Sequence, residues 1–160
     1  VIAMQPTDFT ISRSATIDAP PEVVFEHVND LRNMNAWSPW TQLDPQMTQT
    51  YEGPPAGLDA SYMWSGNSDV GEGRMTIVET RPSELVRMKL EFTKPMEATN
   101  DVTFRLEPVD GKTKITWTMA GENNFIGKAF SLFMDLDKMV GDQFEKGLNN
   151  LKEIVEEPGV

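Results

Sequence analysis

Five side chains in the sequence have chemistry that can orient a polar ligand or move a proton: Arg13, His27, Asp30, Tyr51 and Tyr62. The arginine and the tyrosines can hold a carboxylate, carbonyl or enolate oxygen through hydrogen bonds. The histidine and the aspartate have acid–base chemistry. The sequence holds no HExxH, GxSxG, P-loop or GxGxxG pattern, and a single histidine leaves only carboxylates as metal ligands. We therefore expect polar anchors, with no metal, no cofactor and no assigned catalytic residue.

Each candidate also has a structural interpretation. Arg13 breaks the apolar alternation of a strand, so it either projects into a pocket to orient a carboxylate or enolate, or pairs with an acid at the strand edge. His27 is otherwise a helix-surface or partly buried side chain, and Asp30 otherwise ends the first helix or organises the following turn. Tyr62 is favoured over Tyr51 as a hydrogen-bond donor to a ligand, because Tyr62 falls on the inferred inner face of a sheet.

Composition narrows the class of protein. A chain of 160 residues with 39% hydrophobic residues predicts one globular domain, which we assign to residues 9–157 after an N-terminal extension of residues 1–8. The 25 acidic and 14 basic residues give a formal net charge of −11, which argues against nucleic-acid partners. Cysteine is absent from the sequence, which excludes disulfides, thiolate metal sites and cysteine nucleophiles.

The cellular location stays open. No apolar run approaches the ~20 residues that span a bilayer, so we expect a soluble domain. The apolar opening Val1-Ile2-Ala3-Met4 is either the tail of a removed anchor or signal segment, or a trimmed terminus. The domain is then either cytoplasmic or tethered to a membrane through a segment N-terminal to residue 1.

The first predicted elements are a strand and short helices. Residues 9–17 alternate apolar and polar side chains, as in a half-buried strand. Two prolines then suit the first turn of a helix on which Val24, Val28 and Leu31 share an apolar stripe. Residues 37–40, Trp-Ser-Pro-Trp, form a bend because proline restricts its predecessor. We expect the two tryptophans to clamp this helical corner onto the sheet.

Residues 48–120 alternate between strand-like runs and clusters of Gly, Pro, Asn and Asp, which predicts antiparallel strands. If Asp110-Gly111 is a two-residue turn, one face of the flanking hairpin pairs apolar with apolar residues. The predicted apolar pairs are Leu106–Ile115, Phe104–Trp117 and Val102–Met119. The other face pairs Glu107–Lys114, Arg105–Thr116 and Thr103–Thr118.

The same counting applies to the two preceding hairpins. A four-residue loop at residues 81–84 pairs Ile77–Met88, Met75–Leu90 and Gly73–Phe92, with Arg74 opposite Glu91 on the outside. A turn at residues 67–70 pairs Tyr62–Met75 and Trp64–Gly73. Gly73 then lies between Trp64 and Phe92, where its missing side chain leaves room for their rings, a bulge or a ligand.

Residues 124–156 predict a long helix with one apolar stripe: Phe133, Leu136, Val140, Phe144, Leu148, Leu151 and Val155. Glycines 127, 141 and 147 each cost ~1 kcal/mol relative to Ala in a helix interior, so at least one marks a kink or a close approach. A sheet with one apolar face and a helix with one apolar stripe must cover each other. We predict an α+β fold in which a curved antiparallel sheet wraps around the long C-terminal helix, with two short helices after the first strand.

These segments resemble the START-like, polyketide cyclase/dehydrase and lipid-transport superfamily, which has the helix-grip fold. The resemblance rests on residues 12–25, where an isoleucine strand leads through Ala-Pro into a Val-aromatic helix, on Asn29-Asp30-Leu31, on the bend at residues 37–40 and on residues 144–152. It covers nearly the whole chain. It implies an elongated pocket between sheet and long helix, which different members use for lipids, sterols, polyketides or plant hormones, and some members use for catalysis.

The candidate ligand-binding residues line that implied pocket: Tyr62, Trp64, Met75, Ile77, Met88, Leu90, Phe92, Val102, Phe104, Trp117, Met119, Phe133, Val140 and Phe144. Arg13 and Tyr62 are the candidate polar anchors. Each apolar residue taken singly also fits ordinary core, but ten methionines and many aromatics suit a cavity for irregular ligands. The leading hypothesis is a protein that binds or carries a small hydrophobic molecule without catalysing a reaction. The alternatives are a cyclase or dehydratase that stabilises an enolate, and a co-chaperone-like module that binds a protein.

Overall fold

The computed structural model describes residues 8–40, 44–67, 71–94, 98–122 and 130–156. In chain order its elements are β1 (Asp8–Ile17), α1 (Pro21–Val28), α2 (Leu31–Trp37), β2 (Thr48–Glu52), β3 (Ser61–Ser65), β4 (Glu72–Arg81), β5 (Leu85–Lys94), β6 (Ala98–Val109), β7 (Lys112–Glu122) and α4 (Phe130–Glu156). The predicted order of a strand, short helices, a strand meander and a long helix is confirmed. The predicted start of the long helix at residue 124 lies outside the described residues.

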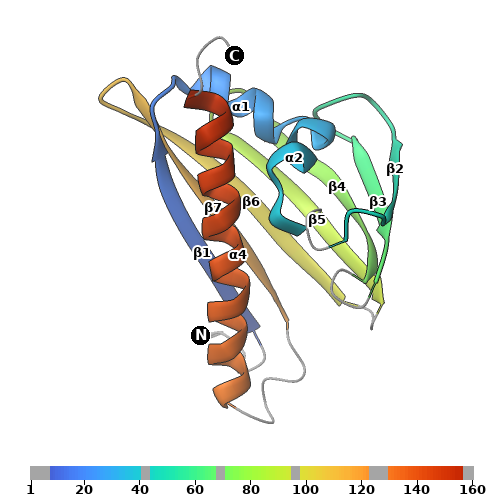
Figure 1. Ribbon diagram of the computed structural model, residues 1–160. Coiled ribbons are helices and arrows are strands. Elements are labelled where there is room, and N and C mark those ends of the chain that lie inside the picture. Colours follow the sequence, from blue (N-terminus) through green and yellow to red (C-terminus); the bar gives the residue numbers. More distant parts are fainter. Residues whose placement is uncertain (1–7, 41–43, 68–70, 95–97, 123–129, 157–160) are drawn as a thin grey trace, which may run out of the picture.

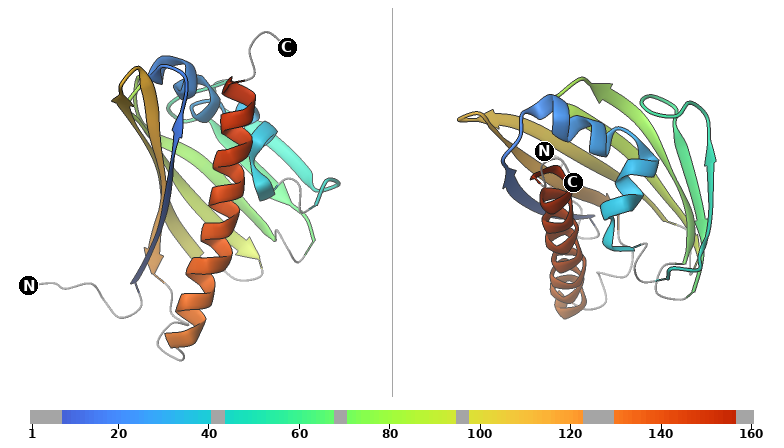
Figure 2. Two further views of the ribbon diagram at one scale, coloured as in Figure 1. Left: turned by 60° about the vertical axis from the view of Figure 1, so that its left-hand side comes forward. Right: turned by 45° about the horizontal axis from the view of Figure 1, so that its top comes forward.

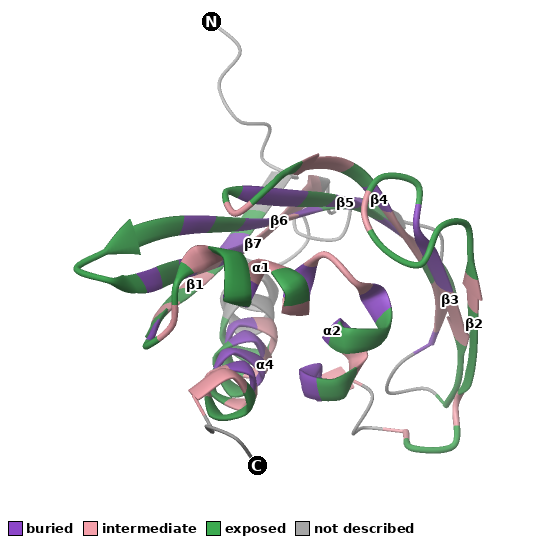
Figure 3. Ribbon diagram, turned by 90° about the horizontal axis from the view of Figure 1, so that it is seen from above, coloured by how far each residue is buried: buried purple, intermediate pink, exposed green. Residues whose placement is uncertain are grey.

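The strands form one seven-stranded antiparallel sheet in the order β1-β7-β6-β5-β4-β3-β2. The sheet is curved, and α1, α2 and α4 all lie on its concave side (Figures 1 and 3). Helix α4 runs alongside β1, as the side view in Figure 2 shows, whereas α2 lies between α4 and the β3–β2 edge. The α+β helix-grip prediction is confirmed. The concave side is called the inner face below.

The strand registers agree with those expected from the turns. Strands β6 and β7 pair Leu106 with Ile115, and Phe104 with Trp117. The same alignment holds for Val102–Met119 and for the polar pairs Thr103–Thr118, Arg105–Thr116 and Glu107–Lys114. Both turn residues have positive φ, 50° at Asp110 and 81° at Gly111, as a type I′ turn requires. Strand β4 also pairs with β3 and β5 as predicted, with Gly73 between Trp64 and Phe92.

The β4–β5 loop is tighter than predicted. Arg81 pairs with Leu85, so the loop has three residues and not four. An irregularity between Ile77 and Glu79 absorbs the extra residue and restores the predicted pairing of Ile77 with Met88. A bulge of this kind leaves no clear mark in the alternation of a sequence, which explains why counting from the turn did not find it.

The helical corner is divided between two helices. Helix α1 starts at Pro21, after an extended Pro20, and ends at Val28. Leu31, which the apolar stripe assigned to this helix, instead begins α2 and is buried there. The break is set by Asp30, whose Oδ1 accepts hydrogen bonds from the backbone N–H groups of Arg32 at 2.8 Å and Asn33 at 3.3 Å. Asp30 therefore organises the turn between the helices.

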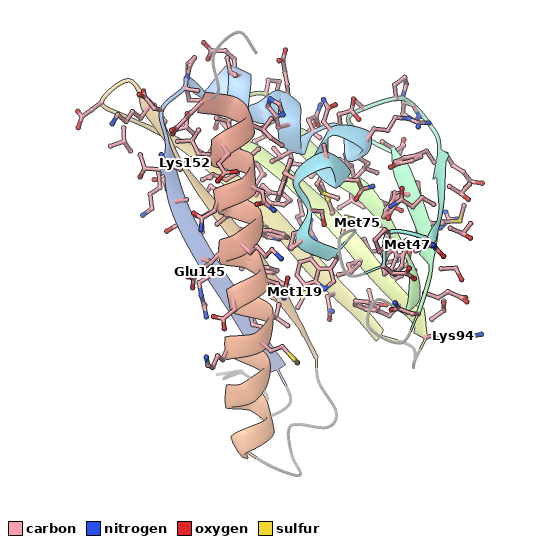
Figure 4. All side chains as sticks on the ribbon, in the orientation of Figure 1. Met47, Met75, Lys94, Met119, Glu145 and Lys152 are labelled. Carbon is pink, nitrogen blue, oxygen red and sulfur yellow. The ribbon has the colours of Figure 1, made fainter. Side chains whose placement is uncertain are left out.

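The C-terminal end of α4 is fastened to the end of β1. The Glu156 carboxylate accepts hydrogen bonds from the Asp18 backbone N–H and from Lys152 Nζ, both at 2.6 Å. Lys152 also donates to the Thr16 carbonyl at 3.1 Å. Figure 4 labels Lys152 at this upper end of α4. Within the described residues, no helix combines the length and apolar content needed to cross a bilayer.

The Glu156 contacts generate a pH-dependent prediction. The Asp18 N–H, and then Lys152, hold the pKa of Glu156 below its ordinary value. A lowered pKa in the folded state stabilises the protein above the ordinary glutamate pKa of about 4.3, and this contribution is lost as the pH falls further. We expect Glu156→Gln to lower the thermal midpoint at pH 7 and to have little effect at pH 3.

The control is Glu153→Gln, because Glu153 is exposed on the preceding turn of α4. Thermal melts followed by circular dichroism between pH 3 and 8 give the comparison. An equal effect of Glu156→Gln at both ends of this pH range would contradict the assignment.

Candidate functional site

The inner face of the sheet gathers the large apolar side chains. Successive strands place Tyr62, Met75 and Leu90 opposite one another, and the same row continues to Asn100 on β6. Side chains on one face of a sheet recur at every second residue, so each strand contributes further members to this face. Thus all the predicted pocket residues on strands lie on the inner face, as the registers require.

Burial divides the inner face into two halves. Residues toward the α1 end are completely covered: Ile77, Met88, Phe104 and Ile115 are each 0% exposed. Residues toward the opposite end of the same strands are only partly buried, and we call them the open half: Trp64, Met75, Phe92 and Met119. Other half-buried side chains pack against the same core, among them Trp40, Met47 and Val140. In Figure 4, Met119 lies beside α4, and Met75 and Met47 lie toward β4 and β2.

The width of the sheet explains this division. Six spacings of about 4.8 Å make a seven-stranded sheet about 29 Å wide, whereas a helix with its side chains is about 10–12 Å wide. Helix α4 therefore covers the β1 side only, and the short helices α1 and α2 cover one end of the remainder (Figure 3). In the described part of the chain, the open half is the stretch of inner face that these helices do not cover.

An aromatic cluster joins the helices to the sheet. The Trp117 ring stacks on Phe144 of α4 with centroids 4.0 Å apart and an interplanar angle of 7°. Trp37 meets Trp117 edge-on at 5.4 Å and Phe104 at 5.8 Å, while Trp40 meets Trp117 at 5.9 Å. The predicted clamp of the helical corner by tryptophans is thus confirmed. These contacts fix the position of α2 relative to α4.

Glycines allow two of the close approaches on α4. A Cβ on Gly147 would lie 2.9 Å from both Pro39 Cδ and Trp117 Cζ3. A Cβ on Gly141 would collide with the Arg13 guanidinium. The prediction that at least one helix glycine marks a kink or a close approach is therefore confirmed at Gly141 and Gly147, and Gly127 lies outside the described residues.

A pair of tyrosines forms a hydrogen-bonded group near α2. Asn35 Nδ2 donates to the Tyr51 hydroxyl at 2.8 Å, and the Tyr51 and Tyr62 rings lie 5.2 Å apart. Burial, and then the neighbouring Tyr51, raise the pKa of Tyr62 well above its ordinary value. The Tyr62 hydroxyl therefore keeps its proton at physiological pH and can donate a hydrogen bond.

Three buried polar atoms near the aromatic cluster and the open half have no hydrogen-bond partner among the described residues: Asn100 Oδ1, Trp117 Nε1 and Gln143 Oε1. An unsatisfied buried polar group costs about 1–3 kcal/mol, so such groups are uncommon unless something else satisfies them. Asn100 makes one long contact, from Nδ2 to the Met119 sulfur at 3.9 Å. Sequence reasoning missed Asn100 and Gln143. Asn100 could have been found, because it occupies an inner position of the alternation that continues with Val102 and Phe104.

Arg13 lies on the inner face opposite Trp117, but its guanidinium is engaged on α4. Its Nε donates to Glu145 Oε2 at 3.0 Å, and the two side chains are 25% and 58% exposed. This is the ion-paired arrangement that was one of the two interpretations of Arg13. Figure 4 labels Glu145 on the side of α4 toward β1.

The remaining candidates lie away from the open half or outside the described side chains. His27 is half-buried on α1, and its backbone carbonyl accepts a hydrogen bond from Trp37 Nε1 at 3.0 Å. Phe133 belongs to the turn of α4 whose side chains are not described. Among the described residues, no group of three or more acidic or histidine side chains is arranged to hold a metal ion.

Comparison with known families assigns this geometry to one of them. A family model described as "Polyketide cyclase / dehydrase and lipid transport" matches residues 8–156. The chain belongs to this family. Membership and fold together support a ligand-binding domain. No curated protein matches the chain in sequence.

Several solved structures share the fold of this protein over nearly the whole chain. A solution structure from Thermobifida fusca has a TM-score of 0.70 and 22% identity, covering 94% of this chain and 95% of that one. The Aha1 dimer from Colwellia psychrerythraea has a TM-score of 0.65 and 17% identity, covering 95% and 99%. Ara h 8.0201 has a TM-score of 0.62 and 14% identity, covering 94% and 99%. Identities this low establish the fold alone.

Gly73 provides a test of the packing at the open half. A Cβ at this position would lie 2.6 Å from Trp64 Cη2 and would also collide with the backbone carbonyl of Glu91. Gly-to-Ala changes in a strand normally stabilise by about 0.5–1 kcal/mol, whereas overpacking costs about 1–3 kcal/mol. We expect Gly73→Ala to lower the free energy of unfolding by about 1–3 kcal/mol, measured by urea denaturation.

Ser14→Ala is the control, because Ser14 is exposed on β1 and its change should leave stability almost unaltered. A Gly73→Ala protein as stable as the parent would show that this close packing is not present in solution.

Proposed function

We propose that this protein binds or carries a small hydrophobic molecule on the open half of the inner face and catalyses no reaction on it. The observation that supports this proposal is the incomplete burial of Trp64, Met75, Phe92 and Met119, although all four face the core. Apolar side chains on an inner face gain free energy when a ligand removes them from water. Methionines adapt their shape to irregular ligands, which suits a carrier.

A cyclase or dehydrase reaction is the second candidate, because the family description names both activities. Proton transfer in such a reaction requires a positioned acid or base. The described inner-face positions of the strands hold no carboxylate and no histidine, and Arg13 is paired with Glu145. Tyr62 is a hydrogen-bond donor with a raised pKa. These features favour binding over catalysis.

A protein-binding module is the third candidate, since the Aha1 dimer is among the similar structures. Such a module would present an apolar patch on an outer surface. The outer face of this sheet instead carries ion pairs, among them Arg87–Asp101 at 3.3 Å and Lys89–Glu91 at 3.7 Å. The charged outer face of the sheet therefore favours a ligand site on the inner face over a protein-binding surface on the outside.

Native mass spectrometry of the gently purified protein tests the proposal first. A co-purifying adduct of the mass of a lipid or polyketide would support it. The second measurement is fluorescence titration with diphenylhexatriene, a hydrocarbon dye that emits in apolar surroundings. Failure to find an adduct, together with failure to bind the dye, would contradict the carrier function.

Met119→Trp should reduce dye binding, because the larger ring fills part of the open half. The matched control is Lys89→Trp, which places the same ring on the exposed outer face of β5. We expect Met119→Trp to weaken dye binding by about tenfold, because the dye then loses part of the apolar surface that it contacts. The control should leave dye binding unchanged. Equal effects of the two substitutions would place the dye elsewhere.

A further inference from the structure

Charge is nearly missing from the inner face. Among the described inner-facing strand positions, the one charged side chain is Arg13, and the Glu145 carboxylate neutralises it from α4. The outer face is the opposite, with Arg74, Arg87 and Lys89 paired to acids. A ligand carboxylate on the open half would therefore meet no free cation there and would be buried against a protein of net charge −11.

The same region also contains buried polar atoms that have no hydrogen-bond partner among the described residues. Asn100 is 7% exposed and Trp117 is 6% exposed, yet Asn100 Oδ1 and Trp117 Nε1 have no partner in the described residues. Both belong to the face that carries Met119: Trp117 precedes it on β7, and Asn100 contacts its sulfur. An indole N–H only donates, whereas an amide oxygen only accepts. The inner face near Met119 thus holds one buried donor and one buried acceptor that no described residue satisfies.

Gln143 adds a second acceptor from α4. Two turns further along the helix, Asn150 Nδ2 donates to the Trp37 carbonyl at 3.1 Å, which shows that this side of α4 faces α2. Residues seven apart share a helix side, so Gln143 lies on the side that faces α2 and not on the Glu145 side that faces β1. Its Oε1 is buried and unpartnered among the described residues.

We infer that the ligand of this site is an electrically neutral molecule with a hydroxyl and a carbonyl group, and that the site discriminates against free fatty acids. The inference rests on the proposed function. The ligand carbonyl accepts from Trp117 Nε1, and its hydroxyl donates to Asn100 Oδ1 or Gln143 Oε1. The Met119 sulfur contacts Asn100 Nδ2, and the unbranched Met119 side chain can turn aside when a ligand enters.

Three compounds of twelve carbons test the charge selectivity: 1-dodecanol, 2-dodecanone and dodecanoate. Each is titrated at pH 8 against bound diphenylhexatriene, with the alcohol and the ketone kept below their solubility limits and dodecanoate below its critical micelle concentration. We expect the alcohol and the ketone to displace the dye at concentrations lower than dodecanoate by about tenfold or more. Equal displacement by dodecanoate would overturn the inference while leaving the proposed function intact. Absence of dye binding would instead overturn the proposed function.

Two substitutions test the polar contacts. Asn100→Leu should reduce the affinity for 1-dodecanol relative to that for the dye by about five- to tenfold, and Trp117→Phe should do the same for 2-dodecanone. Thr99→Leu, on the exposed outer face of β6, is the control and should change neither ratio. Unchanged ratios in both folded variants would overturn the assignment of these contacts. Should one variant fail to fold, the other decides.

Discussion

The rest of the structure depends on one constraint: the sheet is wider than the long helix that packs against it. A sheet of seven strands presents more apolar surface than one helix can cover, and the described elements on that side are the long helix α4 and the short helices α1 and α2. Helix α4 packs along β1, and the aromatic cluster around Trp117 and Phe144 holds α2 beside it. Within the described residues, these helices leave uncovered a continuous stretch of inner face toward one end of the strands. The candidate site is therefore a consequence of how the described helices lie on the sheet.

Local signals in the sequence account for most of the fold. The Asp110-Gly111 turn and strict alternation were sufficient to predict the β6–β7 register, and the same counting placed Gly73 between Trp64 and Phe92. Counting from the turn mispredicted the β4–β5 loop, which is one residue shorter than expected. A bulge in β4 compensates for that residue, so the pairing of Ile77 with Met88 was still predicted correctly. The role of Asp30 was ambiguous in the sequence. The structure identifies it as a helix cap, because its carboxylate accepts a hydrogen bond from the backbone of α2.

The candidate site was less predictable than the fold. Alternation identifies the inner face, but it does not tell a covered residue such as Met88 from a half-buried one such as Met75. That difference depends on where α2 and α4 cross the sheet, and these contacts join residues about a hundred positions apart. The Arg13–Glu145 ion pair, which neutralises the one charged side chain at the described inner-face positions of the strands, is non-local in the same way. The open and uncharged character of the site therefore emerges only from the packed molecule.

The central claim, that ligands occupy the open half, is tested most directly by NMR of protein labelled with 13C-methyl methionine. On titration with 1-dodecanol, the account predicts shifts of the Met75 and Met119 methyl signals. Met63, which contacts Arg74 on the outer side of the sheet, and Met139, which is 62% exposed on α4, should keep their signals unchanged. Unchanged Met75 and Met119 signals at a saturating ligand concentration, or shifts confined to Met63 and Met139, would contradict it.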